Sequence, residues 1–559
     1  GSDSQVVTID ITGTNDDPVL SVEATGSVTE DDSALNLTDS GTLSFTDVDT
    51  TDTHSVSESY NANASWTGGT LSAAQITALT GGFSADSDSW DYTVANADTQ
   101  FLADGETVTF SYDVTVTDDS GTGTATDTEK VTITINGTND APELSVAAVT
   151  GSVTEDASAT DLTSSGALSF TDVDTTDTHT VTVSDNVDAS WSGGTLTSDQ
   201  ITALTGGFSA DTNSWDYTVA NSATQFLADG ETVTFSYDVT VTDDSGTGTA
   251  TDTEKVTITI NGTNDAPELS VAAVTGSVTE DASATDLTSS GALSFTDVDT
   301  TDTHSVSESY NANASWTGGT LSAAQITALT GGFSADSDSW DYTVANADTQ
   351  FLADGETVTF SYDVTVTDDS GTGTATDTEK VTITINGTND APELSVAAVT
   401  GSVTEDASAT DLTSSGALSF TDVDTTDTHT VTVSDNVDAS WSGGTLTSDQ
   451  ITALTGGFSA DTNSWDYTVA NSATQFLADG ETVTFSYDVT VTDDSGTGTA
   501  TDTEKVTITI NGTNDAPELS VAAVTGSVTE DASATDLTSS GALSFTDVDT
   551  TDTHSVSES

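Results

Sequence analysis

Carboxylate groups in short turns are the side chains of this sequence best suited to chemistry. Between residues 139 and 263 they occur as Glu155-Asp156, Asp172-Val173-Asp174 and Asp243-Asp244, with Asn139-Asp140 at the start. Calcium prefers such hard oxygen ligands, about six to eight of them in flexible geometry. An aspartate in a turn also bonds its own backbone, so one cluster alone has two interpretations. The elements that position the clusters must decide between them.

The clusters recur because the whole sequence repeats. The string Asn-Asp-Ala-Pro begins at Asn139, Asn264, Asn389 and Asn514, and a variant begins at Asn15, so the period is about 125 residues. This spacing predicts the end of a preceding module at 1–14, complete repeats at 15–138, 139–263, 264–388 and 389–513, and a truncated repeat at 514–559. Two repeat sequences alternate, and residues 44–309 are identical to residues 294–559. We therefore expect a fragment of a longer protein.

The charge of the chain excludes two classes of partner. The sequence has 93 acidic residues and only 4 basic ones, all lysine, and its formal net charge is −89. Nucleic acids and anionic membranes bind proteins through lysine and arginine, so neither is an expected partner. Cysteine is absent, so disulfides cannot stiffen the fold, and metal ions are a common substitute. The expected partners are calcium ions and the neighbouring repeats, without direct insertion into a membrane.

Alternation of apolar and polar side chains predicts an all-β fold. In the second repeat, apolar residues alternate with polar ones over 233–241, a turn follows at 243–246, and the alternation resumes over 256–260. Further strands are predicted at 144–153, 167–170, 180–183 and 215–219, and short helical segments at 198–204 and 223–228. This pattern is typical of a Greek-key β-sandwich with two sheets.

Large aromatic side chains are predicted to fill the core of this sandwich. In the second repeat they are Trp191, Trp215, Phe208 and Phe226. The core is the simplest use for so much apolar area. An aromatic platform that binds sugar is the functional alternative for the tryptophans.

Strand direction gathers the acidic clusters at the ends of the repeats. The first and last strands are expected to run down and the second and sixth to run up. Each junction should therefore combine a glutamate from below, an Asn-Asp pair in the linker, and two aspartate clusters from above. For the first junction the expected ligands are Glu30, Asn139, Asp140, Asp172, Asp174 and Asp243.

The same positions recur at the other junctions, and calcium is the expected cofactor at each. Before the first repeat they are Asn15, Asp16, Asp47, Asp49 and Asp118. Between the second and third repeats they are Glu155, Asn264, Asp265, Asp297, Asp299 and Asp368. Between the third and fourth they are Glu280, Asn389, Asp390, Asp422, Asp424 and Asp493, and after the fourth they are Glu405, Asn514, Asp515, Asp547 and Asp549. Magnesium fits less well because it gives up its water ligands reluctantly.

Six motifs follow one another in a fixed order in each complete repeat. In the second repeat they are Gly-Ser-Val-Thr-Glu-Asp (151–156), Leu-Ser-Phe-Thr-Asp-Val-Asp (168–174), Asp-Thr-His (177–179), Ser-Trp-Asp-Tyr-Thr-Val (214–219), Phe-Leu-Ala-Asp-Gly-Glu (226–231) and Ile-Asn-Gly-Thr-Asn-Asp-Ala-Pro (260–267). Together they resemble the VCBS repeat of large RTX-type adhesins from Gram-negative bacteria. The junction residues resemble the calcium ligands of cadherin linkers. The repeat is longer than is usual for the family, mainly through residues 193–207.

This resemblance implies a fold, a location and a role. The fold is an immunoglobulin-like or cadherin-like sandwich, and the location is the bacterial surface, reached by type I secretion. The role is that of a calcium-rigidified extender, or spacer, between a cell-anchoring end and a distal ligand-binding domain, in cell adhesion or biofilm formation. The distal ligand is not specified by the resemblance.

Two other kinds of chemistry are not expected. His54, His179, His304, His429 and His554 are one repeated position without a cysteine or basic partner, and no nucleophile or phosphate-loop motif occurs, so the protein is not predicted to be an enzyme. Such a histidine is expected at the surface or beside a metal. A covalent crosslink from lysine is also unexpected, because Lys130 alternates in step with Thr132 and Thr134 and should face solvent.

Direct binding of a sugar, ice or another cell by the repeats themselves is the alternative function. Tandem copies of one module suit multivalent binding. Against it, no segment of one repeat is unlike its copies in a way that suggests a binding site.

Overall fold

Two long strands with apolar residues at every second position form the centre of each repeat. The computed structural model of the chain describes residues 2–31, 33–121, 125–156, 158–246, 250–281, 283–371, 375–436, 438–496 and 500–559. In the second repeat, β17 (Thr232–Asp243) pairs antiparallel with β18 (Thr251–Asn261). Val239 and Val241 are fully buried, whereas the hydroxyls of Thr240 and Thr253 meet on the outer face, 2.8 Å apart. The predicted hairpin is confirmed.

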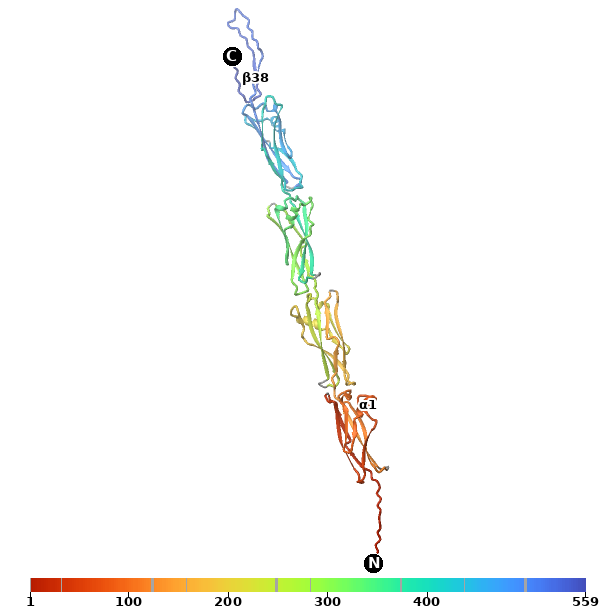
Figure 1. Cartoon of the computed structure of the whole chain (residues 1–559). Helices are drawn as coiled ribbons and strands as arrows, with labels where there is room; N and C mark the ends of the chain where they lie inside the picture. Colours follow the sequence, from red (N-terminus) through yellow and green to blue (C-terminus); the bar gives the residue numbers. More distant parts are fainter. Residues whose placement is uncertain are drawn as a thin grey trace. The chain divides into compact units, whose positions relative to one another are not determined.

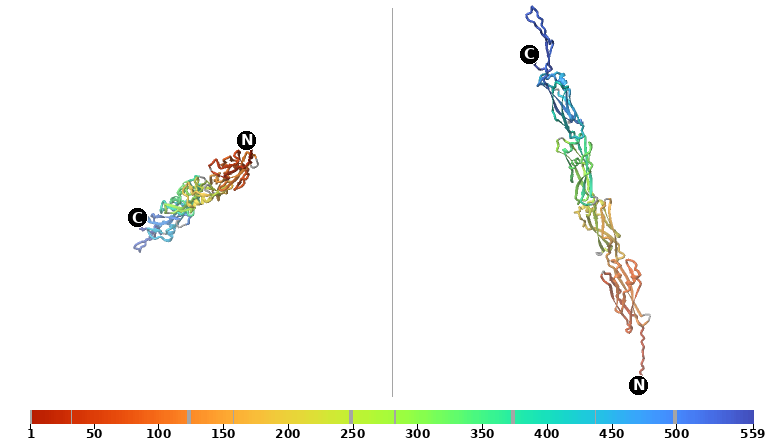
Figure 2. Two further views of the ribbon diagram at one scale, coloured as in Figure 1. Left: turned by 90° about the horizontal axis from the view of Figure 1, so that it is seen from below. Right: turned by 45° about the horizontal axis from the view of Figure 1, so that its top comes forward.

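Two sheets make up the second repeat. One has the order β10 (Glu143–Val146), β12 (Asp161–Thr171), β16 (Ser214–Ala220) and β15 (Phe208–Ala210). The other has the order β11 (Thr150–Thr154), β18, β17 and β13 (His179–Asp185), and β14 (Ser190–Trp191) also pairs with β17. Each complete repeat is a sandwich of this kind, as Figure 1 and the further views of Figure 2 show. The prediction of all-β, Greek-key sandwiches is confirmed.

The first strand of the sandwich is divided between the two sheets. β10 pairs antiparallel with β12, whereas β11 pairs parallel with β18. The indole nitrogen of Trp215 donates a 3.0 Å hydrogen bond to the carbonyl oxygen of Ala148 and so fixes the crossing point. The single strand predicted over 144–153 is therefore wrong, because the backbone must change sheets to pass over the buried Trp215 ring.

The strand predicted over 167–170 is also too short. β12 continues through Gly166, where a Cβ atom would collide with the Trp215 indole. Glycine is needed there to make room for the ring, although in a sequence it usually indicates the end of a strand. The strands predicted at 180–183 and 215–219 are confirmed within β13 and β16.

One of the two predicted helical segments is a true helix. α2 (Ser198–Thr205) begins with a capping box between Thr197 and Gln200 and buries Leu204 against the core. It connects β14, in one sheet, to β15, in the other. The helix predicted at 223–228 is wrong: only a 3₁₀ turn, η2 (Asn221–Ala223), forms, because the hydroxyl of Thr224 closes it on the Asn221 carbonyl oxygen at 2.8 Å.

The core of the second repeat centres on Trp215, which is fully buried as predicted. Phe208, Phe226 and Trp191 are partly buried and pack against this core, and Phe208 stacks on Trp215 and Tyr237. The prediction that these aromatic residues supply the core is therefore confirmed in full for Trp215 and in part for the other three. The phenol rings of Tyr217 and Tyr237 lie deeper, since hydrogen bonds satisfy their hydroxyls.

The first and third repeats have the same elements in the same order. In the first they are β1 (Val19–Val22), β2 (Thr25–Thr29), β3 (Asn36–Thr46), β4 (His54–Tyr60), β5 (Ser65–Trp66), α1 (Ala73–Thr80), β6 (Phe83–Ala85), β7 (Ser89–Ala95), η1 (Asn96–Asp98), β8 (Thr107–Asp118) and β9 (Thr126–Asn136). In the third they are β19 (Glu268–Val271), β20 (Thr275–Thr279), β21 (Asp286–Thr296), β22 (His304–Tyr310), β23 (Ser315–Trp316), α3 (Ala323–Thr330), β24 (Phe333–Ala335), β25 (Ser339–Ala345), η3 (Asn346–Asp348), β26 (Thr357–Asp368) and β27 (Thr376–Asn386).

The fourth repeat matches as well, and a two-stranded sheet follows it. The fourth repeat has β28 (Glu393–Val396), β29 (Thr400–Thr404), β30 (Asp411–Thr421), β31 (Thr430–Asp435), β32 (Ser440–Trp441), α4 (Ser448–Thr455), β33 (Phe458–Ala460), β34 (Ser464–Ala470), η4 (Asn471–Ala473), β35 (Thr482–Thr492) and β36 (Thr501–Asn511). The following residues form β37 (Glu518–Val521) and β38 (Leu543–Thr546).

The chain divides into two compact units. The first holds residues 1–266, 297–303 and 369–375, and the second holds residues 267–296, 304–368 and 376–559. The junction between repeats 1 and 2 lies within the first unit, and those after repeats 3 and 4 lie within the second. Among the described residues, no helix combines the length and the apolar character that crossing a membrane requires.

Candidate metal centre at the repeat junctions

The linker between repeats 3 and 4 is bonded to loops at the near end of repeat 4. β30 ends at Thr421, directly before the Asp422-Val423-Asp424 segment, and β35 ends at Thr492, directly before Asp493. The backbone nitrogen of Asp390 donates a 2.7 Å hydrogen bond to Asp424 Oδ2, and the Asn389 amide donates to Asp493 Oδ2 at 3.3 Å. The strand ends therefore place two aspartate loops around the Asn-Asp pair.

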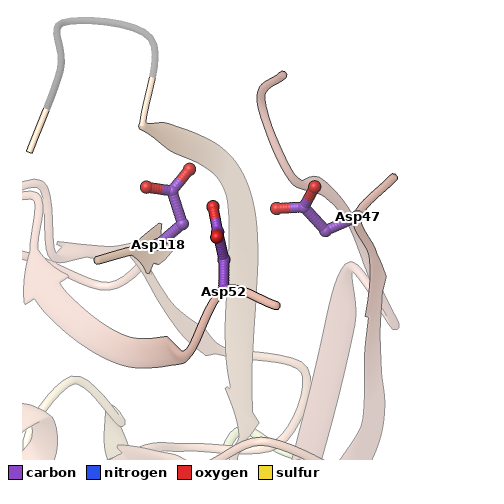
Figure 3. Close-up of side chains that lie close together, drawn as sticks. All are labelled: Asp47, Asp52 and Asp118. Carbon is purple, nitrogen blue, oxygen red and sulfur yellow. The ribbon is translucent and has the colours of Figure 1, made fainter. Parts of the chain in front are cut away.

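Three carboxylates of these loops share one small space. Asp422, Asp427 and Asp493 each offer an oxygen, and these oxygens all lie within 4.8 Å of one another. The equivalent groups are Asp172, Asp177 and Asp243 in repeat 2, and Asp47, Asp52 and Asp118 in repeat 1. In Figure 3 the carboxylates of the last group point toward one another from different segments. Like charges this close repel one another unless protons or a cation intervene.

A glutamate from repeat 3 reaches the same junction. Glu280 is only 4% exposed, and its Oε2 accepts a 3.2 Å hydrogen bond from the backbone nitrogen of Thr388. Its Oε1 accepts a hydrogen bond from the Gln350 side chain. Burial, together with the nearby charges of Asp390 and Asp424, raises the pKa of Glu280 to about 8. The two repeats thus place their carboxylates within electrostatic reach of each other.

Several oxygen atoms at this junction are buried without a hydrogen-bond partner. They are Asn389 Oδ1, Asp390 Oδ2, Asp424 Oδ1 and Asp427 Oδ2. Asp424 is 1% exposed, and burial raises its pKa to about 7, while burial raises the pKa of Asp427 to about 6. Buried polar atoms are rarely left unpaired, because each costs about 1–3 kcal/mol. These oxygens could therefore serve as ligands for a cation.

The residue types fit calcium better than other common metals. Seven side chains that offer oxygen ligands lie at the junction between repeats 3 and 4. Calcium takes about six to eight oxygen ligands. The chain has no cysteine for a thiolate site, and its lysines occupy the last long strand of each repeat rather than these loops. The seven that would hold calcium are Glu280, Asn389, Asp390, Asp422, Asp424, Asp427 and Asp493.

A histidine supports one of these carboxylates from behind. His429 Nε2 lies 2.7 Å from Asp422 Oδ2, and the imidazole ring packs on Phe420 with 4.7 Å between centroids. The other oxygen of Asp422 accepts a 2.9 Å hydrogen bond from the backbone nitrogen of Asp424. This histidine is therefore a neighbour of the acidic cluster and orients one of its members.

The junction between repeats 1 and 2 has the same hydrogen bonds. Asp140 donates its backbone N–H to Asp174 Oδ2 at 2.8 Å, and the Asn139 amide donates to Asp243 Oδ2 at 3.2 Å. Asp174 in turn donates its backbone N–H to Asp172 at 2.9 Å. Glu30, 4% exposed, accepts a 3.1 Å hydrogen bond from the backbone nitrogen of Thr138. The six residues expected at this junction therefore lie there. Glu30 comes from repeat 1, and the other five belong to the linker and to repeat 2.

The remaining expected residues lie at equivalent positions. Before repeat 1, the Asn15 amide donates to Asp118 at 3.1 Å, Asp16 donates its N–H to Asp49 at 2.8 Å, and Asp49 donates to Asp47. In the first unit, Glu155 accepts from Thr263, and Asp265 donates to Asp299, which donates to Asp297. Asn264 lies beside Asp265, and Asp368 ends β26. After repeat 4, Glu405 accepts from Thr513, the Asn514 amide donates to the Asp515 carbonyl oxygen, and Asp515 donates to Asp549, which donates to Asp547.

The sequence-based set omits two groups that the structure adds. Asp427 and its equivalents complete the three-carboxylate cluster, and Gln350 and its equivalents hold the buried glutamate. The spacing Asp-x-Asp-x-x-Asp in each loop is the signal from which the third aspartate could have been found. No sequence signal identifies the glutamine, which belongs to a different loop.

The comparisons with known proteins concern shape rather than sequence. No protein-family model matches the chain, and no curated protein matches it. Among solved structures, four cadherin domains of Drosophila N-cadherin share 13% identity at a TM-score of 0.24, covering 82% of this chain and 92% of that one. The human desmocollin-1 ectodomain shares 11% at 0.23, covering 89% and 81%, and the zebrafish RET cadherin-like domains share 13% at 0.16, covering 82% and 94%.

Proposed function

We propose that this chain is the extender region of a long secreted adhesin, stiffened by calcium at its repeat junctions. The observation that supports this most directly is the set of buried, unpartnered oxygens of Asn389, Asp390, Asp424 and Asp427, gathered where two repeats meet. Without a cation, these atoms and Glu280 disfavour a closed junction. With calcium bound, the same atoms favour one arrangement of the two sandwiches. The repeats would then hold a distal ligand-binding domain away from the cell.

The proposed setting is the outer surface of a Gram-negative bacterium. It rests on the motif order that resembles the VCBS repeats of RTX-type adhesins, which implies type I secretion and a role in cell adhesion or biofilm formation. The high negative charge suits such an environment, because it keeps a long repetitive protein soluble and prevents its copies from associating. We also infer no catalytic role, since His54, His179, His429 and His554 each lie within hydrogen-bond distance of a junction aspartate.

The alternative, in which the repeats themselves bind carbohydrate, is weakened by the packing of both tryptophans of repeat 4. Trp465 is fully buried. One face of Trp441 lies against Gly444, where an added Cβ would come within 2.9 Å of the ring. Phe476 meets Trp441 edge-on, with 4.9 Å between ring centroids and an 89° interplanar angle. Stacking on a sugar requires a free ring face, so the spacer is the better-supported function.

Calcium removal tests the proposal directly. The full chain should melt at a higher temperature with calcium than with EDTA, because an ion that binds only the folded junctions stabilises them by mass action. Small-angle scattering should show a longer and less variable particle with calcium, and magnesium at equal concentration should do less. Equal melting temperatures and equal maximum dimensions with calcium and with EDTA would contradict the proposal. Specific binding of one repeat to a glycan array would instead favour the carbohydrate alternative.

A further inference from the structure

A second link between consecutive repeats lies beside the acidic cluster. The hydroxyl of Thr426, in repeat 4, donates a 2.9 Å hydrogen bond to Glu356 Oε1, in repeat 3. The hydroxyl of the neighbouring Thr425 lies 3.5 Å from the carbonyl oxygen of Phe351. Both threonines stand between Asp424 and Asp427, in the loop that supplies carboxylates to the junction. Repeat 3 therefore contacts this loop directly, without an intervening ion.

Glu356 is held in position by its own repeat. Its Oε2 accepts hydrogen bonds from the Trp316 indole at 3.0 Å and from the backbone nitrogen of Ala353 at 3.2 Å. A Cβ atom on Gly318 would collide with this carboxylate, so glycine leaves the space that Glu356 occupies. The sequence Trp-Thr-Gly-Gly at 316–319 begins the segment that makes this repeat longer than usual. Its contacts with Glu356 give this part of the segment a structural role. Its tryptophan and first glycine fix a glutamate that faces the next repeat.

The same link recurs at the other junctions that lie within one unit. Thr176 donates to Glu106 at 2.8 Å in the first unit, and Thr551 donates to Glu481 at 2.6 Å in the second. Each of these glutamates also accepts from a tryptophan indole, Trp66 at 2.9 Å and Trp441 at 3.1 Å. The link therefore occurs with both repeat sequences on the glutamate side, which indicates a general feature of the junction.

We propose that Glu356 is a positioning residue for the cation-binding loop, and that the Glu356–Thr426 bond is a metal-independent strut between repeats 3 and 4. The strut keeps the loop docked when no ion is bound, so Asp424 and Asp427 stay close to the linker. Ion binding then has fewer groups to order and costs less conformational entropy. The calcium part of this inference rests on the proposed function, whereas the docking part does not.

The test uses the full chain with Thr426→Val, which removes the hydroxyl and nearly keeps the side-chain volume. The matched control is Thr432→Val, on the exposed face of β31. Because the chain has no cysteine, Ser309→Cys and Ser434→Cys each accept one spin label, at exposed positions in repeats 3 and 4. Double electron–electron resonance then gives the width of the label-to-label distance distribution. A calcium titration of the same samples gives the midpoint, which is the calcium concentration at which half of the narrowing of this distance distribution has occurred.

Two results are expected. In EDTA, Thr426→Val broadens the distribution relative to the labelled parent, whereas Thr432→Val leaves it unchanged. The calcium midpoint of Thr426→Val rises by about two- to tenfold, the effect of one lost hydrogen bond. If Thr426→Val leaves the width of the distance distribution in EDTA unchanged, the strut is overturned, whether or not the calcium midpoint changes. A broadened width with an unchanged midpoint would keep the strut and overturn the positioning role.

The design separates this inference from the proposed function. If calcium fails to narrow the distribution of the labelled parent, the calcium-stiffened junction is wrong. The comparison of Thr426→Val with Thr432→Val in EDTA still decides the strut in that case.

Discussion

The hydroxyl of Tyr467 donates a 2.7 Å hydrogen bond to the carbonyl oxygen of Leu454, near the end of α4. Tyr487, which belongs to the opposite sheet, donates to the carbonyl oxygen of the next residue, Thr455. The last carbonyl groups of a helix have no partner within it, so the two tyrosines satisfy two of them. One short helix is thereby tied to both sheets of the sandwich.

Removing this attachment should destabilise repeat 4. Tyr467→Phe and Tyr487→Phe should each lower its free energy of unfolding by about 1–3 kcal/mol, because each leaves a carbonyl oxygen at the end of α4 unpaired. Urea unfolding, monitored by tryptophan fluorescence, should show repeat 4 unfolding at a lower urea concentration than the other repeats. The Thr432→Val variant is the control. A double tyrosine variant that unfolds at the parent's urea concentration would show that the helix needs no such attachment.

Neutralising two junction carboxylates should remove calcium from one place only. Asp422→Asn combined with Asp424→Asn should lower the number of calcium ions bound per chain, as counted by native mass spectrometry. Contacts between repeats involve nearest neighbours, so the other junctions should keep their ions. Asp411→Asn combined with Asp536→Asn changes the charge equally at exposed positions and serves as the control. An unchanged ion count would show that these two residues are not ligands.

Stability without calcium should fall as the pH rises. Burial raises the pKa of Glu280 to about 8 and that of Asp424 to about 7, from ordinary values of 4.5 and 3.8. Between these limits the folded chain holds more protons than the unfolded chain, so the free energy of unfolding decreases with increasing pH. The melting temperature in EDTA should therefore drop between about pH 5 and pH 8. A melting temperature that rises over this range would contradict the assignment.

Calcium should reverse this dependence, because it binds deprotonated carboxylates and its affinity therefore increases over the same range. With calcium in excess, the melting temperature should stay constant or rise over the pH range in which it falls in EDTA. Glu280→Gln combined with Asp424→Asn should flatten both curves for repeats 3 and 4. This variant separates the two buried groups from the general repulsion among the other acidic residues.

No covalent crosslink should form from the lysines. Lys255 is 58% exposed, with its Nζ atom 4.0 Å from Asp188 Oδ2, so it lies at the surface and not inside the sandwich. The exposed position agrees with the strand parity expected for these lysines. The intact mass of the chain should equal that of the sequence. A loss of one water or one ammonia per repeat would contradict this expectation.

Most of the sandwich could be predicted because one face of each strand is buried. The alternation around Val239 and Ile258 follows directly from that condition. The pattern fails at Gly166, which interrupts it and suggests a strand end. In the structure Gly166 lies against the ring of Trp215, a contact between distant residues that a local pattern does not contain. The same limit applies to Trp191, whose place at a sheet end leaves it half-buried.

The candidate site was predictable to the extent that it depends on strand ends. Asp422 and Asp493 directly follow strands and Asp424 comes two residues after Asp422, so strand direction brings all three to one edge. Asp427 lies further along its loop and turns toward the cluster only because the loop closes on itself, with its N–H bonded to the Asp424 carbonyl oxygen at 3.2 Å. Glu356 and Thr426 belong to different repeats, and no pattern within one repeat relates them.

The parallel pairing of β11 with β18 has a consequence for a chain under tension. β11 lies near the start of its repeat and β18 at its end, and they are paired from Thr150 opposite Thr257 to Thr154 opposite Asn261. Pulling the two ends of the repeat apart draws these strands in opposite directions along their length. The hydrogen bonds between them are then loaded together in shear, instead of breaking one after another as in a peeling hairpin. Each repeat should therefore unfold abruptly and at a high force. The force that aligns neighbouring repeats along the direction of pulling should be much lower.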